Sequence, residues 1–167
     1  MKTFLSIGSN IGDRYENLKF AINELDAHPH IWIINKSYLY ETEPMYFLEQ
    51  DTFYNMVIEI DTNLEPLELL DLIKSIEVNR GRKKAVNENM PRVLDIDILT
   101  IGDLYIRSET LNIPHKRFKE RKFVLKPWND IAGDFLVINE NKTVNELLKK
   151  TSDKSVLKMI LDVKGFN

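Results

Sequence analysis

The chain alternates between strand-like and helix-like hydrophobic patterns, and the order of that alternation limits the folds it can adopt. Apolar residues recur at helical spacing in 14–26, after Asp13 as a helix cap, and again between Pro66 and Gly81. Short runs rich in β-branched and aromatic residues predict strands. These runs are 2–7, 31–40, 53–61 and 94–101. The predicted order of elements is therefore β-α-β-β-α-β.

This order predicts an α+β fold with a ferredoxin-like βαββαβ core, in which two helices cover one face of an antiparallel sheet. The 167 residues contain no repeat, low-complexity stretch or linker, so we expect a single domain over 1–167. Weaker patterns continue after the core. They predict a short strand near 105–106, helical turns near 116–119 and 127–131, and extra C-terminal helices at 143–150 and near 153–161.

Composition excludes several classes of protein. The sequence has no cysteine, so it can form neither disulfides nor thiolate metal sites, which fits a reducing cytoplasm. The N-terminal apolar run is too short for a signal peptide, and no window approaches the roughly 20 apolar residues that cross a membrane. The net charge of −3 does not favour bulk nucleic-acid binding. We therefore expect a cytoplasmic protein that neither crosses a membrane nor binds nucleic acid in bulk.

Two aspartates lie two positions apart in the strand predicted at 94–101. Side chains alternate along a strand, so Asp95 and Asp97 project from the same face with their Cα atoms about 6.6 Å apart. Parallel carboxylates repel unless a cation neutralises them, and Mg²⁺ prefers one or two carboxylates with waters and phosphate oxygens. An exposed acidic alternation is the other interpretation. Arg92, which follows Pro91, and the apolar rows around the pair favour a metal site.

Alternation places two further residues on the same face. The apolar row of the strand at 53–61 fits beneath the two helices, whereas Phe53 and Asn55 fall on the opposite row. We therefore expect these two residues to share a helix-free face with the aspartate pair. The loops at 43–52 and 82–92 could fold over that face as lids.

Basic residues flank the aspartate pair in the sequence. They are Arg80, Arg82, Lys83 and Lys84 before it, and Lys116, Arg117, Lys119, Arg121 and Lys122 after it. These clusters are either solvated loops or cationic arms around a metal-bound polyphosphate.

Glu77 and His115 are two further candidates. Glu77 falls on the apolar stripe of the helix after Pro66, where a carboxylate needs a partner. It is either solvated or paired with Arg80, or else it accepts hydrogen bonds from a nucleotide. His115 is either an ordinary surface residue or a hydrogen-bond donor to a polyphosphate.

Five separated motifs resemble those of the 6-hydroxymethyl-7,8-dihydropterin pyrophosphokinase family. The resemblance covers roughly residues 3 to 135, with the motifs in the family's order and spacing. The motifs are Gly8–Asp13, Tyr40–Pro44, Phe53–Asn55, Pro91–Ile98, and Ile113–His115 continued by Arg121–Leu125.

The resemblance implies transfer of pyrophosphate from ATP to the hydroxymethyl group of the pterin, with release of AMP, in folate biosynthesis. It implies that Asp95 and Asp97 hold two Mg²⁺ ions, and that Arg82 and Arg92 stabilise the transferring group. The residues implied for the ATP site are Leu70, Lys74, Glu77, Lys84, Ile98, Asn112, His115, Lys116 and Arg121. Those implied for the pterin site are Thr42, Pro44, Met45, Phe53, Asn55 and Phe123.

The sequence departs from the family's pattern in the lid loops and at the ATP edge. Glu88-Asn89-Met90 stands where a basic residue, a tryptophan and a glycine are usual, and Lys84 stands for an arginine, whose planar fork lysine lacks. Lys116 replaces a common tyrosine, and Glu43 a common proline. Two other hypotheses stay open: another Mg²⁺-dependent nucleotidyl transferase, or a non-catalytic pterin or nucleotide binder.

Overall fold

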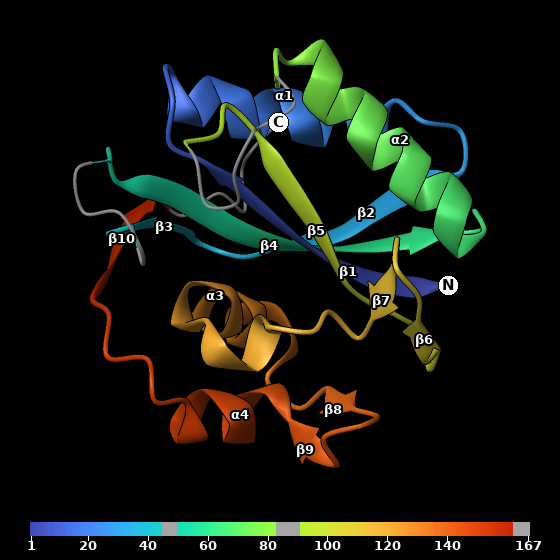
Figure 1. The fold of residues 1–167 in the computed structure, drawn as a ribbon, viewed down its shortest axis with the longest axis vertical. Coiled ribbons are helices and arrows are strands. Elements are labelled where there is room, and N and C mark those ends of the chain that lie inside the picture. The colour runs from blue at the N-terminus through green and yellow to red at the C-terminus, as the bar shows by residue number, and fades with distance from the viewer. Residues whose placement is uncertain (45–49, 83–90, 162–167) are drawn as a thin grey trace.

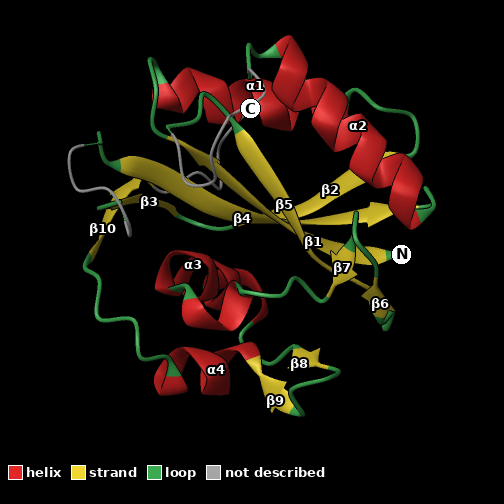
Figure 2. Ribbon diagram, viewed as in Figure 1, coloured by secondary structure: helices red, strands yellow, loops and turns green. Residues whose placement is uncertain are grey.

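A six-stranded antiparallel sheet lies at the centre of the molecule (Figures 1 and 2). The computed structural model describes residues 1–44, 50–82 and 91–161. The strands are β1 (Lys2–Ser9), β2 (Ile31–Lys36), β3 (Leu39–Thr42), β4 (Phe53–Thr62), β5 (Asp95–Ile101) and β10 (Leu157–Leu161). Their order is β10-β3-β4-β1-β5, and β2 pairs with the far half of β4. The predicted α+β fold with an antiparallel sheet is confirmed.

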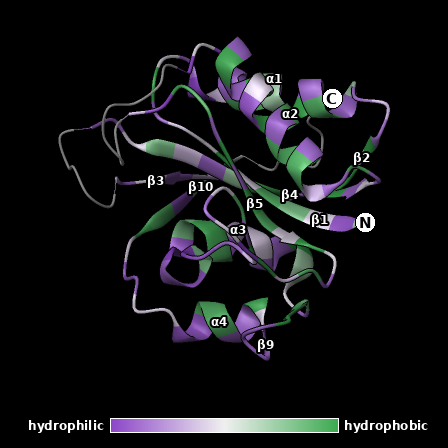
Figure 3. Ribbon diagram, turned by 45° about the vertical axis from the view of Figure 1, so that its right-hand side comes forward, coloured by the Kyte–Doolittle hydropathy of each residue, from purple (hydrophilic) through white to green (hydrophobic). Residues whose placement is uncertain are grey.

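Two helices, α1 (Arg14–Asp26) and α2 (Pro66–Asn79), cover one face of the sheet (Figure 1). The carboxylate of Asp13 caps α1 by accepting a hydrogen bond from the N–H of Glu16 at 3.0 Å. Hydrophobic and hydrophilic residues alternate around both helices, which have one buried side each (Figure 3). The sheet contributes Met56, Ile58 and Ile96 to this core, as their alternation predicts.

A second layer covers part of the opposite face, so the prediction of a helix-free face is wrong there. It contains α3 (Lys122–Ala132), α4 (Val144–Lys150), a 3₁₀ turn (Phe118–Glu120) and the hairpin of β8 (Leu136–Val137) with β9 (Lys142–Thr143). The hairpin of β6 (Ile106–Arg107) with β7 (Asn112–Ile113) instead joins the helix-side core through Ile113. Trp128 of α3 is fully buried against Phe4, and Val57 and Leu99 join the same core. Apolar residues on both faces of the strands therefore make a three-layer molecule.

The C-terminal segment is the clearest difference from the predicted elements. The helix predicted near 153–161 is wrong, because residues 157–161 form strand β10 along the edge of β3. The partner edge lies more than a hundred residues earlier, so no local pattern reports it. Thr143 caps α4, and this helix is predicted correctly.

Two other differences have local causes. The strand predicted at 31–40 is interrupted at Ser37, whose hydroxyl accepts from the N–H of Val57 at 2.9 Å, and it becomes β2 and β3. The turn predicted near 127–131 belongs to the longer helix α3, which continues through Pro127. Within the part of the chain that the structure describes, no helix is long and apolar enough to cross a membrane.

Candidate active site

Asp95 and Asp97 begin the edge strand β5, on the face away from α1 and α2. They lie beside Gly8 and Ser6 of β1, respectively, and both side chains are partly exposed. Ile96, between them, is buried among the residues of the helix-side core. The alternation predicted for this strand is therefore confirmed.

Cationic side chains surround the two carboxylates. Asp95 Oδ1 lies 3.0 Å from Nη1 of Arg82, and Asp95 Oδ2 lies 2.5 Å from Nη1 of Arg92. Asp97 Oδ2 lies 3.5 Å from Nη1 of Arg121 and 3.9 Å from Nε2 of His115. The structure thus brings together residues from three separate predicted segments at one end of the sheet.

Burial and charge perturb several of these groups. Burial, together with the neighbouring Asp95 carboxylate, raises the pKa of Asp97, and burial lowers the pKa of His115 and of Arg121. For Arg92, the carboxylate of Asp95 outweighs the effect of burial and raises the guanidinium pKa. An added cation stabilises the ionised form of a carboxylate most where a neighbouring carboxylate disfavours that form.

The donor set fits Mg²⁺ in one specific way. Two carboxylates on one strand face match the one or two that Mg²⁺ commonly takes from a protein. Within residues 1–44, 50–82 and 91–161, no group of three or more acidic, histidine or cysteine side chains could hold a metal alone. Waters and phosphate oxygens would have to complete the coordination, so the site suits a metal that arrives with a polyphosphate.

Glu77 is 1% exposed and is held by partners on three sides. Its carboxylate accepts from the backbone N–H of Ile96 at 2.8 Å, lies 3.0 Å from Nζ of Lys74, and pairs with Arg82. The alternative of a solvated Glu77, or one paired with Arg80, is wrong, because Arg80 donates instead to Asn17. Burial raises the pKa of Glu77. Glu77 therefore positions Arg82 next to Asp95.

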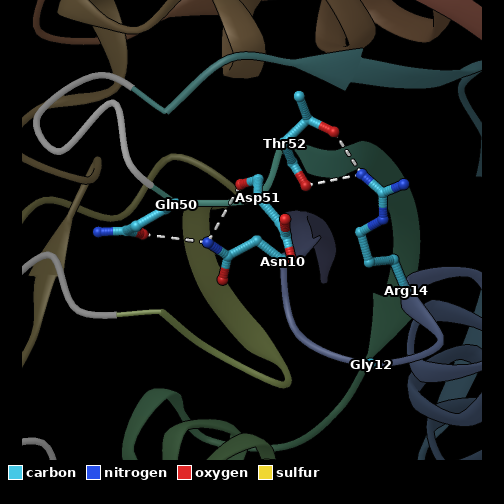
Figure 4. A pocket seen from close by; sticks show the side chains of 6 residues that line it. All are labelled: Asn10, Gly12, Arg14, Gln50, Asp51 and Thr52. Atoms are coloured by element: carbon cyan, nitrogen blue, oxygen red, sulfur yellow. Dashed lines mark hydrogen bonds between the residues drawn. The ribbon is translucent and has the colours of Figure 1, made fainter.

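Asn10, in the turn after β1, joins the segment of Arg92 to the end of the loop at 43–52. Its Oδ1 accepts from the N–H of Arg92 at 2.7 Å, and its own N–H donates to the Arg92 carbonyl at 3.0 Å. Its Nδ2 donates to Oε1 of Gln50 at 3.0 Å (Figure 4). The sequence did not single out Asn10, because a tight turn between strand and helix was enough to account for the motif Gly8–Asp13. A Cβ at Gly8 of that motif would lie 2.6 Å from Oδ1 of Asn55, so a larger residue there would displace the Asn55 side chain.

Arg14 is a second residue that sequence reasoning missed. Its Nη1 donates to the carbonyl of Thr52 at 2.7 Å and to Oε1 of Glu41 at 3.2 Å, and its guanidinium lies 3.9 Å from the ring centroid of Tyr54. Arg14 lines a polar cavity of about 430 Å³ (Figure 4). The other residues of this lining are Asn10, Gly12, Gln50, Asp51 and Thr52. Helix α1 therefore anchors the end of the loop that precedes β4.

Four of the pterin residues implied by the family resemblance lie on strands β3 and β4 and in the first turn of α3. Thr42 and Asn55 are buried on the neighbouring strands β3 and β4, and Nδ2 of Asn55 donates to Oγ1 of Thr42 at 2.8 Å. Phe53 pairs with Thr42 in the sheet, and Phe123 begins α3, where its ring lies 5.7 Å from Cζ of Arg121. Pro44 is buried, and Met45 lies outside the described residues.

The remaining residues of the implied ATP site are more dispersed. Ile98 and Leu70 pack into the helix-side core, and Lys74 is linked to the aspartates through Glu77. Asn112, in β7, donates a hydrogen bond to the carbonyl of Ser108, and its buried Oδ1 has no hydrogen-bond partner among the described residues. Lys116 is exposed, and Lys84 lies outside the described residues.

Comparisons with known proteins identify the family of this chain. Residues 4–133 match the family model described as 7,8-dihydro-6-hydroxymethylpterin-pyrophosphokinase. The chain is 41% identical over 129 residues to 2-amino-4-hydroxy-6-hydroxymethyldihydropteridine pyrophosphokinase of Bacillus subtilis, which covers 77% of each chain. Its identity to the enzyme of that name from Methylorubrum extorquens is 38% over 155 residues, covering 93% of this chain and 96% of the relative.

Other relatives are longer than this chain. It is 40% identical to the folic acid synthesis protein FOL1 of Dictyostelium discoideum and spans 22% of that protein. A solved structure of Plasmodium falciparum HPPK-DHPS, wild type with pteroate, shares the fold with a TM-score of 0.70 at 21% identity, covering 89% of this chain and 42% of that one. By its family match and by its 38–41% identity to relatives of similar length, the chain belongs to the 7,8-dihydro-6-hydroxymethylpterin-pyrophosphokinase family.

Proposed function

We propose that this protein transfers the pyrophosphoryl group of ATP to the hydroxymethyl oxygen of 6-hydroxymethyl-7,8-dihydropterin and releases AMP, in folate biosynthesis. The observation that carries the proposal is the cluster of Asp95 and Asp97 with Arg82, Arg92 and Arg121 at one end of the sheet. Membership of the family supports the hydroxymethyl pterin as the acceptor and ATP as the donor of the pyrophosphoryl group. The enzyme would act in the cytoplasm, in keeping with its cysteine-free sequence.

The reaction is a displacement at the β-phosphorus of ATP. The hydroxymethyl oxygen forms a bond to that phosphorus, the bond to the oxygen bridging the α- and β-phosphorus breaks, and AMP leaves with that oxygen. The hydroxyl proton passes to solvent. Such transfers depend mostly on alignment of the reactants and on cations that match the charge of the transition state. The protein therefore contributes positioning and positive charge.

Asp95 and Asp97 would hold two Mg²⁺ ions, which when bound would neutralise the phosphate charge and the repulsion between the carboxylates. Arg82 and Arg92, which pair with Asp95 in this structure, would then turn to the phosphate oxygens. Glu77 pairs with Arg82 and would keep it at the site during this exchange.

His115 is suited to donate a hydrogen bond in its neutral form. Burial lowers its pKa, and its Nδ1 accepts from the backbone N–H of Arg117 at 3.2 Å. The proton of the neutral imidazole therefore sits on Nε2, the atom nearer Asp97 and the proposed phosphate position. The rest of the proposed ATP site is Leu70, Lys74, Glu77, Lys84, Ile98, Asn112, Lys116 and Arg121.

The pterin would lie between the strand residues and the start of α3. Asn55, whose orientation is fixed by its bond to Thr42, would read the polar edge of the ring. Phe53 and Phe123 would stack on it, which contributes about 0.5–1.5 kcal/mol per aromatic pair beyond burial. Pro44 and Met45 complete the proposed site.

The test is chromatographic detection of AMP and pyrophosphorylated pterin from ATP, the hydroxymethyl pterin and Mg²⁺. Arg92→Ala and Asp97→Ala should each lower turnover at least about 10²-fold, the scale for losing one preorganised charge stabiliser. Asp103→Ala, an exposed acid just after β5, is the matched control and should retain wild-type turnover.

The products also separate the other hypotheses. Free pyrophosphate would identify nucleotidyl transfer, and tight pterin binding by a folded protein that releases no AMP would identify a binder. Either result contradicts the proposal.

A further inference from the structure

We propose that the segment 151–161, here called the C-terminal strap, positions the two walls of the pterin site, with Asp153 as its positioning residue. This inference rests on the proposed function. The strap lies beyond residues 4–133, which match the family model. It runs from the end of α4 back to the edge of the sheet (Figure 1).

One end of the strap holds the start of α3. Oδ2 of Asp153 accepts from the backbone N–H of Lys122, the first residue of α3, at 2.8 Å. The side chain of Lys122 donates in return to the carbonyl of Ser155 at 2.8 Å. Oδ1 of Asp153 accepts from the N–H of Ser155 at 2.8 Å, which fixes the carboxylate. The strap and the first turn of α3 are therefore joined in both directions.

Helix α3 needs this acceptor from outside. Its own N-cap residue, Arg121, makes no side-chain hydrogen bond to the helix, and its first turn contains no acidic residue. The first N–H groups of a helix lack partners within the helix and favour a nearby carboxylate. Asp153 therefore caps α3 from another part of the chain, and its hydrogen bonds keep its pKa below the usual range although burial opposes this.

The other end of the strap holds strand β3. Leu157 pairs with Thr42 and Lys158 with Glu41 in the antiparallel ladder between β10 and β3. Leu157 is four positions after Asp153, so the tether between them is at most about 14 Å long. The strap therefore limits how far β3 and the first turn of α3 can move apart.

These two attachment points are next to the proposed pterin residues. Thr42 lies in β3, and Phe123 directly follows Lys122. A second link, from the hydroxyl of Tyr40 to Oδ2 of Asp130 at 2.7 Å, holds α3 eight residues further along. Core packing and the contact of Arg121 with Asp97 also hold this end of α3. The strap adds the hydrogen bond to the backbone N–H of Lys122, the residue directly before Phe123.

The test uses full-length Asp153→Ala, Asp153→Asn and Glu140→Ala. Glu140 pairs with Lys119 in the same layer but does not contact the strap, so it is the matched control. Asp153→Ala should raise the pterin KM and the calorimetric pterin Kd about five- to tenfold, the scale of a lost helix cap. The ATP KM should change less than about twofold, as for a substitution distant from a site, because Asp97 still holds Arg121. Asp153→Asn should restore most of the pterin affinity, since its amide oxygen accepts the same bond.

The outcomes separate this inference from the proposed function. The proposal for the strap is overturned if Asp153→Ala leaves the pterin KM unchanged or raises the pterin and ATP KM values equally. It is also overturned if Glu140→Ala raises the pterin KM as much as Asp153→Ala does. A wild type that binds the pterin but releases no AMP overturns the proposed function, and the pterin Kd values of the variants then decide the strap. A wild type that neither binds pterin nor releases AMP overturns both.

Discussion

The carboxylate of Glu77 accepts a hydrogen bond from the backbone N–H of Ile96, and this bond joins helix α2 to the edge strand β5. An edge strand presents N–H groups that no neighbouring strand can pair. Glu77 satisfies one of them from within the apolar stripe of α2 and binds Lys74 and Arg82 with the same carboxylate. A buried acid at this position therefore links the sheet edge to the proposed catalytic arginine.

Replacement of Glu77 by leucine should destabilise the protein although leucine suits the stripe. The N–H of Ile96 would lose its acceptor, which costs about 1–3 kcal/mol for a buried group. Glu77→Gln keeps an acceptor oxygen and should lose less. Urea unfolding of both variants measures this, with Asp71→Asn on the exposed side of α2 as control. A Glu77→Leu protein as stable as wild type would contradict the account.

Asn10 should couple the two substrate regions. It is 2% exposed, and Asn10→Ala removes its side-chain bonds to Arg92 and Gln50, so kcat/KM should fall about tenfold. Asn10→Asp keeps the acceptor toward Arg92 but not the donor toward Gln50, and should raise the pterin KM more than it lowers kcat. Steady-state kinetics with Asn23→Ala, an exposed residue of α1, as control measure both effects. If Asn10→Ala had the same kinetic constants as the wild type, the predicted coupling would be contradicted.

The two tryptophans should differ sharply in their contribution to stability. Trp128 is fully buried between α3 and the sheet, whereas Trp32 on β2 is 51% exposed. Trp128→Ala should lower the free energy of unfolding by about 3–5 kcal/mol, as expected for a large core deletion. Trp32→Phe should change it by less than about 0.5 kcal/mol. Denaturant unfolding followed by circular dichroism tests both, and a small loss for Trp128→Ala would mean that the second layer is not part of the core.

Asp153 should make stability depend on pH in the acid range. Burial raises its pKa, but hydrogen bonds from Ser155 and from the N–H of Lys122 outweigh that effect and lower it. A lowered folded-state pKa means that the ionised form stabilises the fold above the unfolded pKa of about 3.9. This contribution is lost as the pH falls through the lower folded value. The stability difference between wild type and Asp153→Asn should therefore shrink from neutral pH to about pH 3. A difference that is independent of pH would show that the charge of Asp153 contributes nothing.

The βαββαβ core could be predicted from the sequence because each of its patterns depends on residues that are close together in the chain. The cap at Asp13 and the alternation of Asp95 with Ile96 each depend on neighbouring residues, and both are confirmed. Strand β10 and the layer of α3 depend on partners distant in the sequence, so they were missed or only partly predicted.

The candidate site shows the same division. Strand alternation singled out the two aspartates beside Arg92, and the family resemblance added Arg82; the structure brings these residues together. Asn10 and Arg14 were not identified, because their roles come from the ends of a loop some forty residues away in the sequence. A motif indicates that a turn is present but not which segments the turn joins.

The most direct test of the central claim follows the phosphate groups of ATP into the products. Separate reactions with ATP labelled at the α- or the γ-phosphate, the hydroxymethyl pterin and Mg²⁺ are resolved by chromatography. The account predicts that the α label is found in AMP and the γ label in the pterin product, in equal amounts. Label in ADP, in free pyrophosphate, or in unreacted ATP alone from folded protein would contradict it.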